Sequence, residues 1–308
     1  MENERRRTLD ELVDRYELEP DLCDIYVEGK TDKLLIEWFL DQKEHQGFVV
    51  YEIDTVEIPA QLLFEQGLKD NNRSRVIALA LYIQDKLSET PLHLICIADK
   101  DFDLLFGKEY QCDLLLFTDY SCLEMYLFNE VVLDKCLRLG LRLPQPEAGE
   151  ILNQVSKVLE YLFLIRATNE ALELNMTWLK NFGDCCKLNK KNQIQFDSTT
   201  FITKYLNSNS NRSQESRFIT KLEELRAKEL IEIRYKIHGH DFTELLCWYI
   251  RPYLREEIRN SYNSKILAGS LLACIDAEKL AQEGLFQNLL ARIGRYRTYA
   301  LTEKTKYG

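Results

Sequence analysis

The sequence predicts an α/β protein, in which a small parallel sheet flanked by helices is followed by a mostly α-helical C-terminal domain. Two observations lead to this prediction. Up to residue 130, short apolar runs alternate with segments whose apolar residues recur at helical spacing. Beyond it, long helical patterns dominate the rest of the 308-residue chain. We expect an N-terminal helical arm over residues 1–22, a sheet-containing catalytic domain over 23–130, and a helical domain over 131–308 for partner, dimer or substrate contacts.

The elements of the first two segments follow from the spacing of their apolar residues. Leu9, Leu12 and Tyr16 fall on one face of a helix in the arm. An apolar run bounded by turns is typical of a strand buried in a parallel sheet. Strands that alternate with helices predict such a sheet, with helices on both faces. The predicted strands are Cys23–Val27, Phe48–Ile58, His93–Ala98 and Leu114–Phe117, and helices are predicted from Thr31 or Lys30, over Asn72–Leu87 and from Leu123.

Helical periodicity continues through the second half of the chain. Polar stretches over residues 184–195 and 207–213 are predicted as loops, and Glu232–Ile237 as one short strand. The predicted helices are Glu147–Arg166, Asn169–Leu179, Thr199–Leu206, Glu215–Leu230, Phe242–Ile250, Ser264–Cys274 and Ala277–Tyr296.

Composition excludes several classes of protein. The net charge of −10 argues against a general nucleic-acid binder, which is usually basic, although a local basic surface or metal ions could still bind nucleic acid. The basic residues from Arg292 to Lys306 are a candidate for such a surface, and a solvated helix end is the alternative. The nine cysteines form no Cys-x-x-Cys pair, so a zinc site is not expected. Without a membrane-length apolar run or a signal-peptide core, the sequence predicts a cytoplasmic protein.

Acidic residues follow three of the predicted strands. Glu28 follows the first, Asp99, Asp101 and Asp103 follow the third, and Glu124 comes after the fourth. Parallel strands end at one edge of a sheet, and alternate residues of an extended chain, such as the first two aspartates, point the same way. Clustered carboxylates repel unless a cation neutralises them, and Mg²⁺ and Mn²⁺ prefer oxygen ligands. We therefore expect a site for two such ions, although any one of these acids could instead form a turn or cap a helix.

One apparent motif in the same stretch is rejected. Gly29-Lys30-Thr31 looks like the end of a phosphate-binding P-loop. That motif requires a glycine five residues before Gly29, and Asp24 occupies the position. We therefore assign no nucleotide-binding role to this segment, and any ATPase involved would be another chain.

The order of Glu28-Gly29, Asp99-Lys100-Asp101 and an acidic residue near the next helix resembles the TOPRIM fold. Topoisomerases, bacterial primases, recombination proteins and OLD-family nucleases share that fold. The sequences of two segments, Val27–Lys33 and Asp119–Leu127, are similar to motifs of the OLD-type nucleases. Gly239-His240-Asp241 resembles a motif of the TOPRIM-like effectors of the PARIS anti-phage system, which work beside an ABC-type ATPase.

The resemblance implies a metal-dependent nuclease that hydrolyses phosphodiester bonds. Glu28 would be the general acid/base or a metal ligand, while Asp99 and Asp101 would hold Mg²⁺. Glu124 would help to hold a second ion, with Asp103 as an auxiliary ligand. Lys30, or else Lys33 or Lys100, would stabilise charge on the scissile phosphate.

Substrate and partners also follow only from the resemblance. The defence effectors suggest RNA, specifically tRNA, and a nuclease held inactive by a partner ATPase until it is triggered. The wider OLD family suggests DNA instead. A non-catalytic TOPRIM-like binding module is a further alternative, and a homodimer is compatible with the apolar patterns of the helical half. His240 either approaches the metal site or positions the RNA, unless it and His238 cap a loop while Asp241 caps the Phe242 helix.

Overall fold

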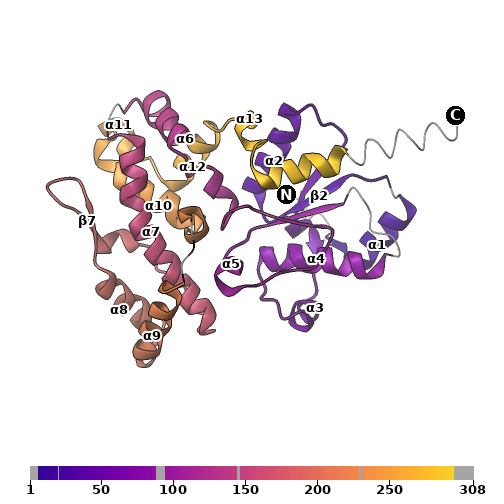
Figure 1. The fold of residues 1–308 in the computed structure, drawn as a ribbon, viewed down its shortest axis with the longest axis horizontal. Coiled ribbons are helices and arrows are strands. Elements are labelled where there is room, and N and C mark those ends of the chain that lie inside the picture. Colours follow the sequence, from indigo (N-terminus) through magenta and orange to yellow (C-terminus); the bar gives the residue numbers. More distant parts are fainter. Residues whose placement is uncertain are drawn as a thin grey trace. The chain divides into compact units, whose positions relative to one another are not determined.

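The computed structural model describes residues 6–19, 21–87, 94–143, 146–228, 230 and 232–294. The chain divides into two compact units (Figure 1). The first comprises the residues up to Lys100, Glu109–Asp119 and the residues from Asp276 onward, and the second comprises Asp101–Lys108 and Tyr120–Ile275. This division differs from the predicted domains, because the predicted arm and the C-terminal segment both belong to the unit that contains the sheet.

The first unit is built on a four-stranded parallel sheet, which confirms the predicted α/β class. The strand order is β3 (Val49–Glu52), β2 (Asp24–Val27), β5 (Ile95–Ala98) and β6 (Leu115–Phe117). From β2 the chain forms β3 on one side and then crosses to form β5 on the other. The strand order therefore reverses between β2 and β5, and ligands of open α/β sheets bind beyond the carboxyl ends of strands at such a point.

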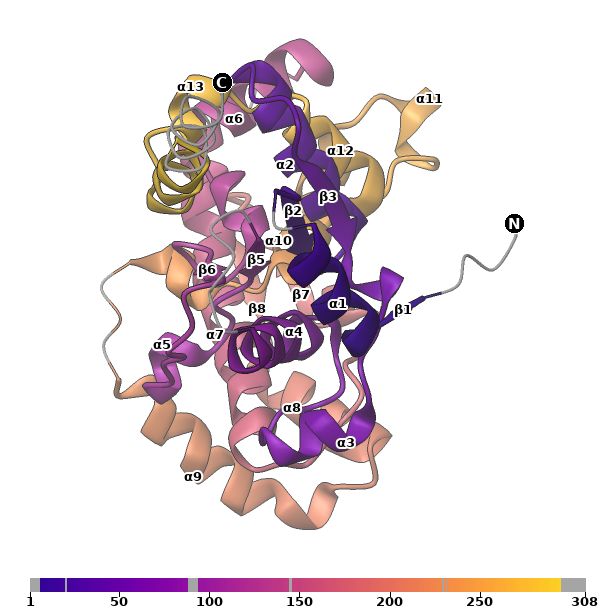
Figure 2. The same cartoon turned by 90° about the vertical axis from the view of Figure 1, so that its right-hand side faces the viewer.

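Helices cover both faces of this sheet (Figures 1 and 2). On one face, α1 (Leu9–Leu18) and α4 (Asn72–Lys86) form a continuous apolar core with Tyr26 and Cys96. On the other lie α2 (Lys30–Gln42) and a helix over residues 284–294, whose Phe286 ring contacts Phe39 with centroids 4.6 Å apart. Two short helices complete the unit: α3 (Ala60–Glu65) and α13 (Ala277–Leu280).

The described part of the N-terminal segment packs into this core through Leu9, Leu12 and Tyr16. The strand β1 (Arg7–Thr8) pairs in parallel with β4 (Val56–Glu57). The Tyr16 hydroxyl donates a hydrogen bond of 2.9 Å to the buried carboxylate of Asp24, which Arg15 also approaches to 3.3 Å. A buried carboxylate requires such partners. The helix α1 therefore supplies the groups that make burial of Asp24, at the start of β2, possible.

The stretch predicted as one strand over Phe48–Ile58 is broken. A 3₁₀ turn at Ile53–Thr55 separates β3 from β4, and the two strands belong to different sheets. Thr55 stabilises this turn by donating its hydroxyl to the carbonyl of Glu52 at 2.7 Å. The β-branched and aromatic composition is compatible with either arrangement, so it could not reveal the break.

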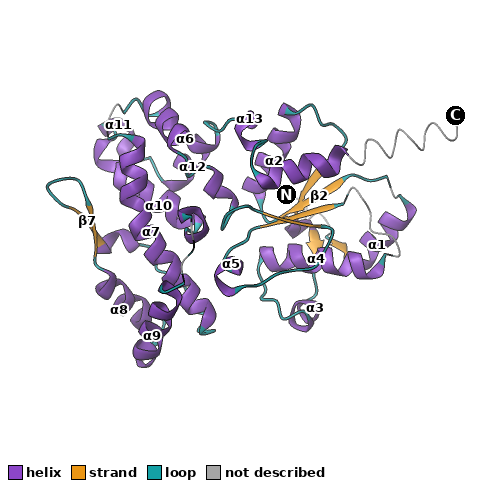
Figure 3. Ribbon diagram, viewed as in Figure 1, coloured by secondary structure: helices purple, strands orange, loops and turns teal. Residues whose placement is uncertain are grey.

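In the part of the second unit that the structure describes, helices predominate and the β7–β8 hairpin provides the strands (Figure 3). The long helix α7 is buried along much of its length and contacts α6, α9 and α10. The elements are α5 (Asp103–Phe106), α6 (Glu130–Lys135), a π-helical turn (Cys136–Gly140), α7 (Ala148–Ala171), β7 (Cys186–Leu188), β8 (Ile194–Phe196), α8 (Ser198–Ser208), α9 (Glu215–Arg226), α10 (Gly239–Ile250), α11 (Glu256–Arg259) and α12 (Ser264–Leu272).

Four local predictions for this unit were wrong. No separate helix forms over Asn169–Leu179, because α7 continues to Ala171 and residues 172–179 are not helical. The stretch over residues 184–195, predicted as a loop, contains most of the β7–β8 hairpin. The strand predicted at Glu232–Ile237 is a 3₁₀ turn over Ile233–Lys236, and the helix predicted from Leu123 is a 3₁₀ turn over Leu123–Tyr126. Segments of three or four residues carry too little periodicity to distinguish these conformations.

The C-terminal segment, predicted as one helix over Ala277–Tyr296, is interrupted after α13 and continues over residues 284–294. Its second part joins the first unit through polar contacts as well as Phe286. The carboxylate of Asp119 accepts the Leu285 N–H at 3.0 Å, and Arg292 donates to the Leu115 carbonyl at 3.0 Å. The basic residues beyond Gly294, candidates for nucleic-acid contact, lie outside the described residues.

Two global features bear on the sequence predictions. None of the nine cysteines, all of which lie within the described ranges, forms a disulfide, and Cys23 and Cys96 are buried as small core residues. Within the described ranges, none of the helices combines the length and the apolar character needed to cross a bilayer.

Candidate active site

Glu28 and Asp99 meet at the carboxyl edge of the sheet. Each directly follows a strand, β2 and β5 respectively, and the two strands are neighbours. The Glu28 Oε1 atom accepts a hydrogen bond from the Asp99 backbone N–H at 2.7 Å. Both residues are half-buried. Two sequence-predicted acids are thus brought together at the point where the strand order reverses.

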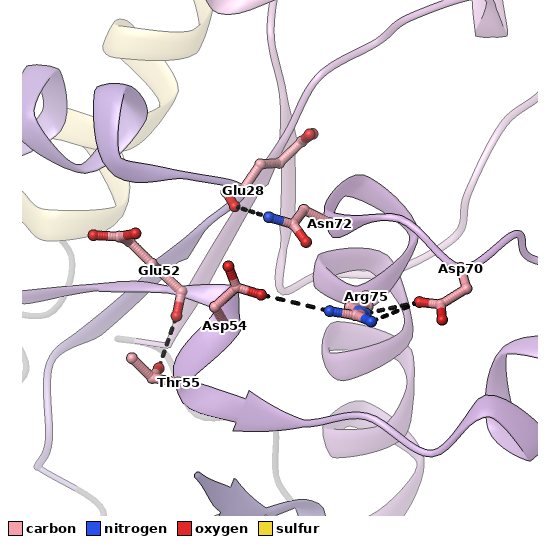
Figure 4. Close-up of polar contacts among 7 residues, drawn as sticks. All are labelled: Glu28, Glu52, Asp54, Thr55, Asp70, Asn72 and Arg75. Carbon is pink, nitrogen blue, oxygen red and sulfur yellow. Dashed lines mark hydrogen bonds and ion pairs between the residues drawn. The ribbon is translucent and has the colours of Figure 1, made fainter. Parts of the chain in front are cut away.

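The first turn of α4 holds the backbone of both acids. Asn72 Nδ2 donates to the Glu28 carbonyl at 2.9 Å, a contact visible in Figure 4. The next residue, Arg73, donates from Nε to the Asp99 carbonyl at 2.6 Å. Asn71 caps the helix by accepting the Ser74 N–H. The positive end of the α4 dipole therefore lies beside the two strand ends.

Other acids near this edge are occupied in a different way. Arg75 contacts the carboxylates of Asp70 at 2.8 Å and Asp54 at 3.5 Å. Glu52 ends β3, but its side chain and that of Glu28 extend in different directions (Figure 4). Exposed ion pairs of the Arg75 kind contribute little energy. They show that Asp54 and Asp70 face Arg75.

The three candidate lysines differ in their surroundings. Lys30 is the first residue of α2 and is exposed. Lys33 pairs with Glu37 one turn along the same helix at 3.7 Å. Lys100 donates from Nζ to the Asp119 carbonyl at 3.2 Å, and its backbone N–H donates to the Thr118 hydroxyl. The ammonium of Lys100 is therefore held by the chain itself, whereas Lys30 projects from the start of a helix.

Asp101, Asp103 and Glu124 belong to the second unit. Asp101 has a φ of +45°, a left-handed conformation that non-glycine residues adopt at some cost, and its N–H donates to the Ser121 carbonyl at 2.6 Å. Asp103 is buried at the start of α5. Glu124 is half-buried in the turn Leu123–Tyr126.

The Gly239-His240-Asp241 motif forms the start of α10. The helix begins at Gly239 with His238 as its N-cap, so Asp241 lies inside the first turn and is not the cap that the alternative reading assumed. The buried Asp241 carboxylate accepts two hydrogen bonds from Arg166, at 2.7 and 2.8 Å. Burial lowers the pKa of His238 to about 3, while His240 is exposed. The motif's aspartate is thus an anchor between α10 and α7.

The donor set at the sheet edge fits a hard divalent cation. Mg²⁺ is commonly bound by one or two carboxylates, with water and substrate phosphates as its remaining ligands. Glu28 and Asp99 offer two carboxylates on adjacent strand ends. Among the described residues, no group of three or more His, Cys, Asp or Glu side chains is arranged to hold a metal ion. A cation held by this pair would therefore depend on water and on the substrate to complete its coordination.

The structure also reveals residues that the sequence did not single out. Asn72 and Arg73 looked like the start of an ordinary helix, and only their contacts connect them to the candidate site. Arg166 lay in a predicted helix, and nothing in its spacing pointed to Asp241. The second unit also has an open pocket of about 470 Å³, lined by α10 and the residues around Phe182 and Asn263.

No family model matches the chain, and no curated protein matches it significantly. The functional assignment therefore depends on the geometry of these residues and on the motifs they form.

Proposed function

We propose that this chain is a metal-dependent nuclease of the TOPRIM type, with Glu28 and Asp99 at the centre of its active site. One observation carries the proposal: the two acids lie on adjacent strand ends at the reversal of the strand order, joined by a 2.7 Å hydrogen bond. The sequence pattern adds Asp101, Asp103 and Glu124 to the proposed carboxylates. Lys30 is the proposed electrostatic contact to the substrate.

The protein's own groups suit phosphodiester hydrolysis. A divalent cation bound to the carboxylates would neutralise the charge that develops on the scissile phosphate. Glu28 has one carboxylate oxygen fixed by the Asp99 N–H, which orients the group to take a proton from an attacking water. The exposed ammonium of Lys30 would meet a non-bridging phosphate oxygen.

RNA is the substrate we propose, with tRNA as its first form to test. This choice follows from the resemblance of the Gly239-His240-Asp241 motif to defence effectors. DNA, suggested by the OLD-type motifs, is the alternative that the same assay examines. A partner ATPase of the ABC type that restrains the nuclease is part of the proposal on the same ground.

The decisive experiment incubates the purified chain with tRNA and with plasmid DNA, in Mg²⁺ or Mn²⁺ and in chelator. We expect cleavage of tRNA that requires the metal and is lost in Glu28→Ala. Cleavage of plasmid alone would reassign the substrate to DNA. If neither is cut, with or without a co-expressed ATPase, the chain is a non-catalytic module and the enzyme proposal is wrong.

A further inference from the structure

The start of α10 lies directly against the carboxylate of Glu124. A Cβ atom placed on Gly239 would lie 2.5 Å from Glu124 Cδ and 3.0 Å from Cys122 Sγ, and closer still to Glu124 Oε2. Real Cβ atoms essentially never approach other atoms so closely. Any side chain at this position would therefore displace Glu124. The glycine of the Gly239-His240-Asp241 motif has a steric purpose, because the helix adopts ordinary dihedral angles here and needs no left-handed residue.

The carboxylate of Glu124 lies beside the start of α10. The 12-residue helix α10 has no side-chain hydrogen bond from its N-cap, His238. The first N–H groups of such a helix carry partial positive charge that stabilises a nearby anion. Among the described residues, no hydrogen bond or ion pair to the Glu124 carboxylate is formed. The carboxylate is therefore placed by its contact with the start of α10, and within the described residues no protein donor engages its oxygens.

Both sides of this contact are fixed. On the helix side, Asp241 receives two hydrogen bonds from Arg166 of α7, whose guanidinium lies 3.7 Å from the ring centroid of Trp178. A buried bidentate pair of this kind has one well-defined geometry. It holds the first turn of α10 in place.

On the glutamate side, Ser121 fastens the preceding loop to the segment before α10. Its hydroxyl donates to the carbonyl of Ile237 and also lies 3.0 Å from that of Arg234, while its N–H donates to the Arg234 carbonyl at 3.2 Å. The Ser121 carbonyl in turn accepts the N–H of Asp101. One serine thus connects the strained Asp101 with the turn that carries Glu124.

We propose that Gly239 is a positioning residue for Glu124. Because Gly239 has no side chain, the Glu124 carboxylate can lie against α10. The Asp241–Arg166 pair fixes the position of the helix start at this contact. The steric part of this proposal stands on the geometry alone, whereas its catalytic part rests on the proposed nuclease function.

A double-mutant cycle in thermal stability tests the steric part without any activity assay. Gly239→Ala should lower the melting temperature by roughly 2–4 °C, since the flexible end of Glu124 must move aside and Cys122 Sγ leaves little further room, a cost of about 1 kcal/mol. In a Glu124→Ala background the same change should shift it by less than about 2 °C, because the obstructing carboxylate is gone and alanine is the better helix former. Equal losses in both backgrounds would overturn the proposal.

Gly149→Ala is the matched control. A Cβ at Gly149, in the first turn of α7, would lie 3.0 Å from Oε1 of Glu130. The Gly149→Ala substitution therefore also crowds a glutamate carboxylate at the start of a helix, but a different one. Its effect should be the same with or without Glu124→Ala. If Gly239→Ala does not accumulate as folded protein, recovery of folded protein in Gly239→Ala/Glu124→Ala supports the proposal, and failure of both overturns it.

Metal-dependent cleavage tests the catalytic part. Gly239→Ala should raise the Mn²⁺ concentration for half-maximal cleavage at least about tenfold, while Gly149→Ala leaves it unchanged. An unchanged metal requirement in Gly239→Ala, beside a clear stability coupling, would overturn the positioning role. If the wild-type chain cuts nothing, the nuclease proposal fails, and the melting temperatures still test the contact between Gly239 and Glu124. If the chain cuts RNA but Gly239→Ala has the same effect on melting temperature with and without Glu124→Ala, only the positioning proposal fails.

Discussion

The Glu28 carboxylate accepts a hydrogen bond from the backbone N–H of Asp99 at 2.7 Å. This bond joins two neighbouring strands just beyond the end of their ladder, where β2 and β5 no longer pair. An acid held there is oriented by the sheet itself and does not depend on a mobile loop. The two residues contribute differently to this contact. Glu28 contributes its carboxylate, whereas Asp99 contributes its backbone N–H and keeps its own carboxylate for other contacts. Substitutions of the two side chains can therefore be compared separately.

Glu28→Gln should abolish metal-dependent cleavage while leaving the fold intact. The glutamine Oε1 can still accept the Asp99 N–H, so we expect a change in the free energy of unfolding below about 1 kcal/mol. The loss of a carboxylate should lower cleavage at least about 100-fold. Glu52→Gln, at the end of the adjacent strand β3, is the control and should retain activity. Equal loss in both variants would show that the effect is not specific to Glu28.

Arg73→Ala should weaken both stability and cleavage. It removes the 2.6 Å hydrogen bond to the Asp99 carbonyl, which we expect to cost about 1–2 kcal/mol in urea unfolding. A displaced Asp99 should also lower cleavage about tenfold or more. Arg75→Ala, two residues along the same helix, breaks only exposed ion pairs to Asp54 and Asp70 and should cost less than about 1 kcal/mol. Similar effects of the two changes on cleavage would contradict a positioning role for Arg73.

The sequence was sufficient to predict the parallel sheet, because strands buried on both faces are near-continuous apolar runs with turns at each end. It also predicted that Glu28 and Asp99 would lie at one edge of the sheet, whereas only the structure shows that their strands, β2 and β5, are neighbours. The contacts of Asn72 and Arg73 could not be predicted, since a side-chain bond across 44 or 26 residues leaves no periodic signal. The same holds for the C-terminal helix at residues 284–294, whose apolar pattern shows that it packs but not against which unit.

The π-helical turn at Cys136–Gly140 and the 3₁₀ turn at Leu123–Tyr126 illustrate a second limit. Both have the composition of an α-helix, and the difference arises from how their neighbours pack. Glu124 was therefore correctly noted as an acid beyond the fourth strand, while the conformation that places it against Gly239 was not foreseen.

Asp101→Gly and Asp101→Ala should separate backbone strain from chemistry. Asp101 has a φ of +45°, which glycine adopts without a Cβ penalty and alanine does not. We expect the glycine variant to be more stable than the alanine variant by about 1 kcal/mol in chemical denaturation. Both should lose cleavage if the carboxylate is required. A glycine variant that retains full activity would remove Asp101 from the proposed site.

Arg166→Lys should destabilise the second unit. Lysine keeps the charge but cannot reproduce the two hydrogen bonds to the buried Asp241 or the contact with Trp178. We expect a loss of about 1–3 kcal/mol, because the bidentate geometry is lost while the charge is kept. Arg226→Lys, an exposed partner of Glu223 on α9, is the control and should cost less than about 1 kcal/mol. A small loss at Arg166 would mean that the anchor of α10 lies elsewhere.

His238 should make the stability of the second unit fall in mild acid. Burial, together with the nearby Arg166 and His240, lowers its pKa to about 3 against the opposing effect of Asp241, whereas an unfolded histidine has a pKa of about 6.5. Between those values the unfolded chain binds a proton that the folded chain does not, so this contribution to stability is complete above pH 6.5 and declines as the pH falls toward 3. The slope is at most about 1.4 kcal/mol per pH unit.

His238→Asn removes this titration and keeps a residue suited to an N-cap. Urea unfolding at pH 7, 6 and 5 should therefore show a shallower loss of stability in the variant than in the wild type. Carboxylates that titrate in the same range are common to both proteins and cancel in the difference. Parallel pH profiles for wild type and His238→Asn would show that His238 is protonated as readily in the folded chain as in the unfolded one.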